Sequence, residues 1–357
     1  MSIFKPFSLG NIELKNKIVM APLTRSRAID NIPNELMAEY YEQRATAGLI
    51  ISEGTSPSPN GIGYPRIPGA YSDAQIEGWK KIATAVHAKG GKIFVQLMHT
   101  GRITAKVNMP DGAITLAPSA IQASGEMFTD NDGFVPHEIP KAMTLEEIKS
   151  SQDEFVLAAK RLINEAEIDG IELHAANGYL LNQFINPKSN QREDNYGGSI
   201  ENRSRYVLEV AEKVANAIGG DRVGIRLSPY GAFNDLESNY DALEDTFIYM
   251  SQQIALLNLA YIHVVDQRVA FGAPDFTTDI KKTIKENFKG TIISGGDVNT
   301  IEKGEAIINS GLDLVYVGRP FISNPNFVEK LQNNQKLVSP DAETFYTPGA
   351  QGYTDYQ

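Results

Sequence analysis

The sequence predicts an α/β fold in which eight parallel strands, each followed by a helix, close into a single (β/α)8 barrel of the TIM type. Two observations carry this prediction. Short apolar runs recur at fairly regular spacing along the 357 residues, and longer segments of helical period lie between them. Strand followed by helix, eight times, indicates a parallel sheet, and eight such units close naturally. A doubly wound open sheet is the alternative.

The eight predicted strands are rich in Val and Ile and are bounded by Gly, Pro or polar residues. This composition is typical of strands that are buried on both faces. The predicted strands span residues 17–23, 48–55, 92–98, 170–175, 222–229, 261–267, 291–297 and 314–320.

The predicted helices begin at residues that cap helix N-termini well. Asn34 and Asp73 are expected N-caps, and Thr144 with Glu147 matches a capping box. The eight helices span residues 34–47, 73–89, 144–167, 201–218, 241–258, 275–288, 299–310 and 325–332.

Two segments depart from the strand–helix pattern. Residues 3–16 resemble a short β-hairpin that turns at Gly10-Asn11, and we expect it to plug the bottom of the barrel. Residues 99–143 form a long excursion after the third strand, where a barrel usually carries a functional insertion or lid. No linker divides the chain, so residues 1–357 are expected to form one domain.

The composition excludes several classes of protein. Lys and Arg number 33 against 44 Asp and Glu, and the net charge of −11 argues against nucleic acid or anionic lipid as the main partner. The absence of cysteine removes disulfides, thiolate metal sites, cysteine nucleophiles and iron–sulfur clusters. The N-terminus lacks the apolar region of a signal peptide, and no stretch approaches the ~20 apolar residues of a membrane span. We therefore expect a cytoplasmic protein without membrane contact or bound metal.

Polar side chains stand on three adjacent predicted strands, near the ends where barrel active sites lie. Gln96 is on the third strand, Glu172 and His174 are on the fourth, and Arg226 is on the fifth, each on the face opposite the aliphatic residues. Burying such groups without partners costs on the order of several kcal/mol, and a polar ligand in the barrel mouth would supply the partners. The alternative is that Gln96, Glu172 and Arg226 satisfy one another in a structural network.

The last two strands end in glycine-rich turns that indicate a phosphate site. Gly295 and Gly296 end the seventh strand, and Gly318 and Arg319 end the eighth. Loops at these two strands bind phosphate in many barrels, because glycines let backbone N–H groups approach the oxygens and an arginine adds charge. The alternative is that the glycines only make tight turns. Together, the two turns favour a phosphorylated cofactor or substrate.

The segment HAANGYLLNQF (174–184) follows the fourth strand directly. His174 and Asn177 offer neutral hydrogen-bond donors that suit a carbonyl or nitro oxygen. Tyr179 is a phenol with an ordinary pKa near ~10, which suits proton donation to a carbanion-like carbon. Each residue alone has a structural explanation, but the triple at the catalytic end of a strand is more specific.

These residues belong to longer blocks through which the chain resembles the Old Yellow Enzyme family of FMN-dependent ene-reductases. The match runs from Phe4 to about Tyr356, and its strongest block is HAANGYLLNQFINPKSNQREDNYGGSIENRSRY (174–206). APLTRSRA (21–28), GLIISEGT (48–55), VQLMHTGR (95–102) and GYTDY (352–356) agree independently. The chain looks most like the bacterial branch that includes N-ethylmaleimide, pentaerythritol tetranitrate and 2-cyclohexenone reductases.

The resemblance implies a tightly but non-covalently bound FMN. Thr24 would hydrogen-bond to flavin O4, Gln96 would bind the pyrimidine edge, and Arg226 would stabilise the reduced flavin near N1 and the C2 carbonyl. The residues implied to line the flavin ring are Ala21, Pro22, Leu23 and Gly54, and those implied to hold the ribityl phosphate are Gly295, Gly296, Gly318 and Arg319.

The resemblance also implies the reaction. NAD(P)H, with NADPH favoured, would reduce the flavin; an α,β-unsaturated ketone, aldehyde, maleimide or nitroalkene would then take the hydride at Cβ while Tyr179 protonates Cα. His174 and Asn177 would hold the substrate oxygen, and the other substrate contacts would be Tyr64, Met98 and Tyr346. The protein would be a monomer or a homodimer.

Three features set this chain apart from the family's pattern. Asn177 is one of two forms, since some bacterial relatives carry His there. Met98 stands where close relatives often have Trp, and its flexible side chain should alter substrate pose and stereochemistry. Residues 99–143 match least well, so substrate preference is the property that transfers least.

Three other functions compete with ene-reduction. The main activity could be the reduction of nitroesters or nitroaromatics. An aldolase or phosphosugar isomerase without flavin could use the phosphate site, but no Lys ends a strand and only Glu53 and Glu172 supply good carboxylates. A non-catalytic flavin-binding protein would not need Tyr179, His174 and Asn177.

Overall fold

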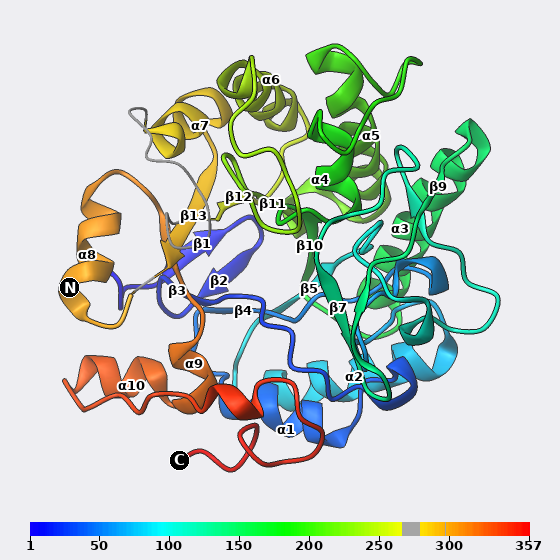
Figure 1. Ribbon diagram of the computed structural model, residues 1–357. Coiled ribbons are helices and arrows are strands. Elements are labelled where there is room, and N and C mark those ends of the chain that lie inside the picture. Colours follow the sequence, from blue (N-terminus) through cyan, green and yellow to red (C-terminus); the bar gives the residue numbers. More distant parts are fainter. Residues whose placement is uncertain (266–278, 297) are drawn as a thin grey trace.

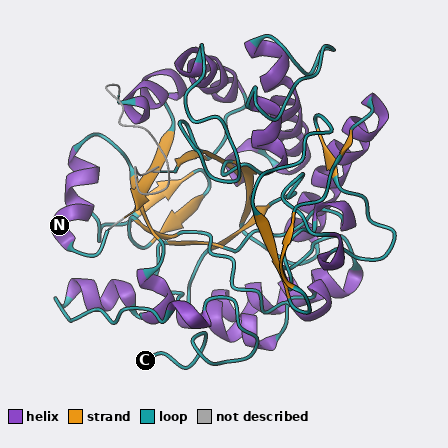
Figure 2. Cartoon of the chain, in the orientation of Figure 1, coloured by secondary structure: helices purple, strands orange, loops and turns teal. Residues whose placement is uncertain are grey.

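Eight parallel strands form a closed barrel surrounded by helices (Figures 1 and 2). The computed structural model describes residues 1–265, 279–296 and 298–357. The strands follow one another around the barrel in chain order, and the last pairs with the first, Val315 beside Ile18. The predicted (β/α)8 barrel is therefore confirmed, and the open-sheet alternative is wrong.

Most barrel strands are shorter than predicted, because the last residues of the predicted strands lie in loops. Their bounds are β3 (Ile18–Met20), β4 (Leu49–Ile51), β5 (Ile93–Leu97), β10 (Gly170–Ala175), β11 (Val223–Leu227), β12 (Tyr261–Val264), β13 (Thr291–Gly296) and β14 (Leu314–Val317). Residues 318–320 were predicted as strand, but Pro320 instead begins helix α9 (Pro320–Ser323), where its missing N–H is not needed. The predicted strand ends at 266–267 and Asp297 lie outside the described residues.

All eight predicted helices have counterparts among the described residues, and two short helices, α4 and α9, were not predicted. Asn34 and Thr144 cap helices as expected. Ser72, not Asp73, caps the second helix, because its side chain accepts from Gln75 N–H in a capping box. Residues 275–278 of one predicted helix lie outside the described residues. The bounds are α1 (Glu35–Gln43), α2 (Asp73–Ala88), α3 (Leu145–Asn164), α4 (Leu180–Ile185), α5 (Ile200–Ile218), α6 (Leu243–Leu256), α7 (Ile280–Phe288), α8 (Ile301–Asn309) and α10 (Phe327–Gln332). In the part of the chain that the structure describes, no helix is both long and apolar enough to cross a bilayer.

The N-terminal hairpin plugs the bottom of the barrel, as predicted. Strands β1 (Phe7–Leu9) and β2 (Ile12–Leu14) pair antiparallel, and Gly10 in the turn has a φ of +56° that favours glycine. Leu9 and Leu14 are fully buried and pack with lumen residues at the starts of the barrel strands. Figure 1 shows this blue hairpin lying across the ring of barrel strands.

The segment 99–143, between β5 and α3, carries two small sheets. Strand β6 (Leu116–Ala117) pairs in parallel with β9 (Lys141–Ala142), and β7 (Glu126–Thr129) pairs antiparallel with β8 (Gly133–Pro136). These strands could not be predicted, because two to four residues are too few to show a period. A lid function for this segment stays a prediction.

The hydrophobic core divides between the two faces of the barrel strands. Val95, Leu173 and Ile225 pack outward against the helices, whereas Phe94 and Tyr261 fill the lumen. The alternation predicted for the third to fifth strands is therefore confirmed, and it turns Gln96, Glu172, His174 and Arg226 toward the lumen.

Candidate active site

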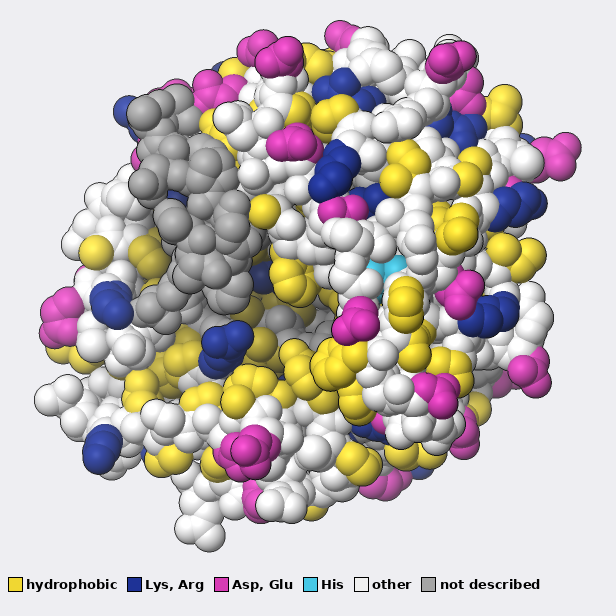
Figure 3. Space-filling view, in the orientation of Figure 1, with side chains coloured by type: hydrophobic (Ala, Val, Ile, Leu, Met, Phe, Trp, Pro, Cys, Tyr) yellow, Lys and Arg dark blue, Asp and Glu magenta, His cyan; other side chains and the backbone are white. Residues whose placement is uncertain are grey.

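Polar side chains gather at the C-terminal end of the barrel lumen. In the parallel ladder His174 of β10 lies beside Arg226 of β11, which lies beside His263 of β12, and all three are buried. The face drawn in Figure 3 is hollowed near its centre, and hydrophobic side chains gather around the hollow. Because catalytic residues of such barrels come from the C-terminal strand ends, this region is the candidate active site.

Glu172 lies one layer deeper and holds a buried network. Gln96 Nε2 donates to Glu172 Oε1 at 2.7 Å, and His263 Nδ1 lies 2.8 Å from Glu172 Oε2. Burial alone would raise the pKa of Glu172, but His263, Arg226 and Gln96 together lower it. Burial lowers the pKa of His263, so a neutral imidazole donates its Nδ1–H to the carboxylate. The structural-network alternative therefore holds for Gln96 and Glu172.

Four further buried polar atoms toward the C-terminal ends of the barrel strands have no hydrogen-bond partner among the described residues. Each leaves a donor or acceptor that costs about 1–3 kcal/mol unless something satisfies it. They lie on four successive barrel strands, so they indicate a shared polar ligand rather than isolated defects. The atoms are His174 Nδ1, Arg226 Nε, His263 Nε2 and Ser294 Oγ.

Tyr179, just beyond β10, faces His174 and Tyr64. Its ring stands edge-on to His174, 4.8 Å between centroids, and its hydroxyl oxygen lies 3.1 Å from that of Tyr64. Burial raises the pKa of Tyr179, and hydrogen bonds with Tyr64 and Asn234 only partly oppose this, so the phenol keeps its proton at neutral pH. Burial, Arg226 and His263 hold the pKa of His174 well below its usual range. The pair is thus a protonated phenol beside a neutral imidazole.

Tyr346 reaches the same region from the far end of the sequence. Its side chain is 55% exposed, unlike those of Tyr64 and Tyr179. Burial raises the pKa of both buried phenols, and Tyr346 adds to this effect. The carbonyl oxygen of Tyr346 accepts from Arg66 Nη2 at 2.7 Å, and Arg66 lies two residues after Tyr64. The structure therefore brings the predicted substrate contacts Tyr64 and Tyr346 together, with Tyr346 at the rim.

Asn177 occupies a turn that is held through its backbone. Its φ is +57°, a region that Asn tolerates better than most residues. Its N–H donates to Ser228 Oγ at 2.8 Å, and its carbonyl oxygen accepts from Asn234 Nδ2 at 2.8 Å. Gly178 follows with a φ of +78°, and a Cβ there would lie 2.7 Å from that of Asn234. These contacts fix the backbone of Asn177 in the turn between His174 and Tyr179.

Met98 closes the space beside Gly54. A Cβ on Gly54 would lie 2.5 Å from Met98 Sδ. Met98 belongs to one apolar cluster with Tyr64, Tyr179 and residues of the 99–143 segment such as Met127. The predicted substrate contacts Met98 and Tyr64 therefore pack in the same apolar cluster as side chains of the 99–143 segment.

The loop after β3 begins in the lumen and continues toward β14. The Ala21 N–H donates to the Val317 oxygen at 2.9 Å, and Ala21 packs in the lumen cluster. Pro22, Leu23 and Thr24 are half-buried. Leu23 faces Gly318, since its Cδ2 lies 3.8 Å from where a Gly318 Cβ would be. Leu23, which was predicted to line the flavin ring, thus lies beside Gly318, which was predicted to hold the ribityl phosphate.

The glycines of the predicted phosphate site differ in their surroundings. A Cβ on Gly295 would lie 2.1 Å from the Tyr316 oxygen, so close packing alone requires glycine there. Gly318 meets only Leu23, and Arg319 is exposed, 6.0 Å from the Phe345 ring. Close packing within the barrel therefore explains why residue 295 is glycine, whereas Gly318 and Arg319 leave room for a ligand.

Sequence reasoning missed His263 and the loop after β11. His263 stands among aliphatic residues of the sixth strand, so the alternation used for His174 would have found it. Asn234 and Asp235 lie in a loop with φ values of +57° and +62°, and no periodic signal marks them.

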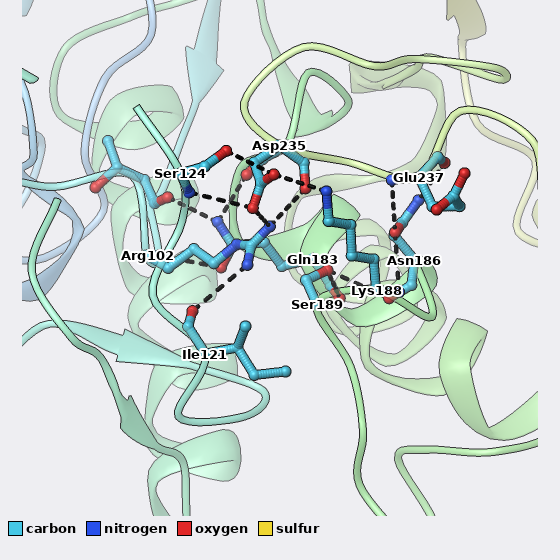
Figure 4. Close-up of polar contacts among 11 residues, drawn as sticks. Arg102, Ile121, Ser124, Gln183, Asn186, Lys188, Ser189, Asp235 and Glu237 are labelled. Carbon is cyan, nitrogen blue, oxygen red and sulfur yellow. Dashed lines mark hydrogen bonds and ion pairs between the residues drawn. The ribbon is translucent and has the colours of Figure 1, made fainter. Parts of the chain in front are cut away.

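Asp235 anchors that loop to the segment 99–143 (Figure 4). Its carboxylate accepts from Ser124 Oγ and Lys188 Nζ, both at 2.7 Å, and from the Arg102 guanidinium at 3.3 Å. Arg102 is fully buried, and the network fixes the loop whose Asn234 side chain contacts Tyr179 and Asn177.

Comparisons with known proteins agree with one another. The model of the NADH:flavin oxidoreductase / NADH oxidase family matches residues 2–337. A probable flavin mononucleotide-dependent alkene reductase of Leishmania infantum is 39% identical, over 99% of this chain and 96% of its own length. Morphinone reductase has a TM-score of 0.94 at 40% identity, covering 99% of this chain and 96% of its own. The Old Yellow Enzyme homologue of Zymomonas mobilis has a TM-score of 0.93 at 40% identity, covering 100% and 99%.

Proposed function

Because the chain belongs to the NADH:flavin oxidoreductase family of Old Yellow Enzyme proteins, and is thus an NAD(P)H-dependent flavin oxidoreductase, we propose that it reduces the activated C=C bond of α,β-unsaturated carbonyl compounds, maleimides and nitroalkenes. The observation that carries the proposal is the contact of neutral His174 with protonated Tyr179 beside the Tyr64 hydroxyl. His174 can thus donate a hydrogen bond to a substrate oxygen while the adjacent Tyr179 supplies a proton to a substrate carbon.

The roles of His174 and Tyr179 follow from their protonation states, and the neutral amide of Asn177 is a second hydrogen-bond donor. His174 and Asn177 hold the carbonyl or nitro oxygen, and their hydrogen bonds strengthen as negative charge develops on it, which favours the transition state over the bound substrate. Tyr179 gives its phenolic proton to Cα. Tyr64 donates to the Tyr179 oxygen as the charge forms there, at their separation of 3.1 Å.

FMN fits the residues that remain. When bound, FMN supplies the hydride chemistry between NAD(P)H and the alkene. The unpaired Arg226 Nε and Ser294 Oγ suit the polar atoms of a flavin, and Gln96 is held in one orientation by Glu172. Ala21, Pro22, Leu23, Thr24 and Gly54 would line its ring, and Gly295, Gly296, Gly318 and Arg319 would hold its phosphate.

The apolar surroundings favour an electron-poor alkene as the substrate. Met98, Tyr64 and Tyr179 share a cluster with apolar residues of the segment 99–143, which suits a largely hydrocarbon molecule with one polar end. Reduction of nitroesters or nitroaromatics is the second proposed activity, because the same donors suit a nitro oxygen. NADPH is the proposed reductant and the cytoplasm the proposed compartment, with the protein acting as a monomer or homodimer.

The experiment is anaerobic reduction of the yellow protein by NADPH, followed by 2-cyclohexenone, in wild type and Tyr179→Phe. We expect enone reduction to fall about 10²–10⁴-fold in Tyr179→Phe, because the proton source is lost, while bleaching by NADPH persists. Tyr71→Phe, in the same apolar cluster, is the matched control and should behave as wild type.

Three outcomes would change the conclusion. Full activity of Tyr179→Phe would end the proton-donor role. A protein that bleaches with NADPH, ignores the enone and reacts with a nitro compound would make nitro reduction the main activity. A colourless protein that takes up no FMN would contradict the proposal as a whole.

A further inference from the structure

The guanidinium of Arg66 joins three segments that are far apart in the sequence. Its Nε donates to the Ser26 oxygen at 2.9 Å and its Nη2 to the Tyr346 oxygen at 2.7 Å, and Nη1 pairs with Asp130. Ser26 belongs to the loop after β3, Tyr346 to the C-terminal segment, and Asp130 to the turn between β7 and β8. A planar fork of fixed donors is needed to satisfy three such partners at once.

Arg66 is itself held firmly. Its side chain is only 14% exposed although it pairs with a surface carboxylate. Its backbone has a φ of +52°, and its carbonyl oxygen accepts from Ala28 N–H at 3.0 Å. A non-glycine residue in this region persists only where surrounding contacts over-determine it. Arg66 is therefore held through its backbone as well as through the three partners of its guanidinium.

Two of these segments, and the loop of Arg66 itself, carry a residue of the candidate site. Thr24 precedes Ser26 by two positions, and Tyr64 precedes Arg66 by two. Tyr346 is bound by Arg66 through its own carbonyl, on a segment where its side chain is 55% exposed. Asn108 Nδ2 also joins the Gly63 and Phe128 oxygens, so the β7–β8 hairpin meets the Tyr64 loop twice.

We propose that Arg66 is a positioning residue for substrate binding, which holds Tyr346 and the β7–β8 turn against the Tyr64 loop at the mouth of the pocket. The inference rests on the proposed function, because it takes the region around Tyr64, Tyr179 and Tyr346 as the substrate pocket. Arg66 acts through Tyr346, not on the reacting atoms. Loss of Arg66 then weakens binding and leaves the limiting rate of the chemical step unchanged.

The test compares wild type, Arg66→Ala, Tyr346→Ala and the double variant. Binding of 2-cyclohexenone to the oxidised, flavin-loaded proteins is measured by visible absorbance titration, and reoxidation of the reduced proteins by stopped flow. We expect Arg66→Ala to raise the Kd and KM about tenfold, the scale of one charge-assisted hydrogen bond, with the limiting rate within about twofold. In the Tyr346→Ala background, Arg66→Ala should change the Kd less than about threefold, because coupled residues are not additive.

Further variants separate positioning from stability. Arg66→Lys keeps a charge for Asp130 but cannot bind both carbonyl oxygens, so its Kd should lie between those of wild type and Arg66→Ala. Asp130→Ala removes only the ion pair and should have a smaller effect. Arg161→Ala breaks ion pairs with Asp73 and Glu165 on the outside of α3, and should leave the Kd unchanged.

The outcomes are distinguishable. An unchanged Kd in a flavin-loaded Arg66→Ala protein overturns the inference, and so does an equal effect in the Tyr346→Ala background. If Arg66→Ala does not fold, wild-type Kd values in both Arg66→Lys and Asp130→Ala overturn it. Failure of the wild type itself to hold flavin or to react with the enone contradicts the proposed function instead.

Discussion

Glu172 is fully buried, and side chains of β5 and β12 contact its two carboxylate oxygens. Gln96 Nε2 donates to one oxygen and His263 to the other, while the positive charge of Arg226 favours the ionised form. Glu172 therefore sets which way the Gln96 amide faces, and a glutamine amide is chemically two-sided. The residue shapes the proposed flavin site without being part of it.

We expect Glu172→Gln to weaken FMN retention. A neutral amide offers one acceptor where the carboxylate offered two, so Gln96 or His263 loses its partner and Arg226 loses a countercharge. The Kd of FMN, measured by fluorescence titration of the apoprotein, should rise about tenfold, and the free energy of unfolding should fall by about 2–4 kcal/mol. Glu165→Gln, at a half-exposed position on the outer helices, is the control. An unchanged Kd would show that Gln96 keeps its orientation without Glu172.

At the scale of elements, the loop after β11 and the segment 99–143 behave as one unit. Asp235 links them by accepting from Arg102, Ser124 and Lys188, and the neighbouring Asn234 reaches Asn177 and Tyr179. The loop thus connects the insertion to the turn that carries the proposed catalytic residues.

Asp235→Ala should destabilise this unit. Buried Arg102 would lose its carboxylate partner and keep only carbonyl oxygens, which costs about 3 kcal/mol in the free energy of unfolding. Because Asn234 would lose its anchor, hydrogen exchange in residues 228–242 should also become faster. Chemical denaturation and exchange measurements check both effects, with Asp153→Ala on the outside of α3 as the control. Equal exchange rates in variant and wild type would mean that the Asp235 network does not hold the loop after β11 in place.

For the plug hairpin we predict an effect on stability without an effect on flavin binding. Leu9 is fully buried in the lumen at the bottom of the barrel, away from the C-terminal strand ends. Leu9→Ala should lower the free energy of unfolding by about 3 kcal/mol through lost burial and a cavity, with FMN content unchanged. Leu157→Ala, 57% exposed on α3, should change neither quantity. Loss of flavin in Leu9→Ala would mean that packing at the bottom of the barrel affects the proposed FMN site at the C-terminal strand ends.

On the scale of the whole molecule, three buried arginines fasten the C-terminal segment to the barrel. Arg25 donates to the Gly352 oxygen at 2.7 Å, Arg27 to the Thr344 oxygen at 2.9 Å, and Arg44 to the Tyr353 oxygen at 3.3 Å. These acceptors are neutral carbonyl oxygens, so the contacts bury no carboxylate beside the arginines. The carboxyl group of Glu53 accepts from the Arg25 N–H, and burial raises its pKa to about 7. The C-terminal segment, which carries Tyr346, is thus fixed to the barrel.

Buried histidines make the stability of the whole molecule depend on pH. Burial lowers the pKa of His99 to about 3, and also lowers those of His137, His174 and His263. Between pH 6.5 and 3 the unfolded chain therefore binds more protons, so stability is present above about pH 6.5 and is lost as the pH falls. Glu53, raised to about 7, acts in the opposite direction between pH 4.5 and 7, but it is one group against four.

We expect the free energy of unfolding to fall from pH 7.5 to pH 5. His99 alone accounts for about 2 kcal/mol of this fall, because each pH unit below 6.5 adds about 1.4 kcal/mol. Denaturant unfolding at the two pH values measures it. His99→Asn keeps an acceptor for Gly101 N–H and should reduce the fall by that amount. The same fall in His99→Asn as in wild type would mean that His99 titrates normally in the fold.

The sequence alone was enough to predict the barrel, the plug hairpin and the polar faces of β5, β10 and β11. These follow from local patterns. A short apolar run rich in Val and Ile between turn residues favours a strand, and residues at every second position of a strand share one face. His263 obeys the same rule. The short strands β6 to β9 and helix α4 carry no period, and they escaped prediction for that reason.

Only the tertiary structure decided which distant residues share the site. Arg66 with Tyr346, Asp235 with Arg102, and Glu172 with His263 are each separated by tens to hundreds of positions. Such pairings depend on how loops leave the barrel and on which buried group finds a partner. These are properties of packing and of hydrogen-bond satisfaction across the whole fold, which no local pattern encodes.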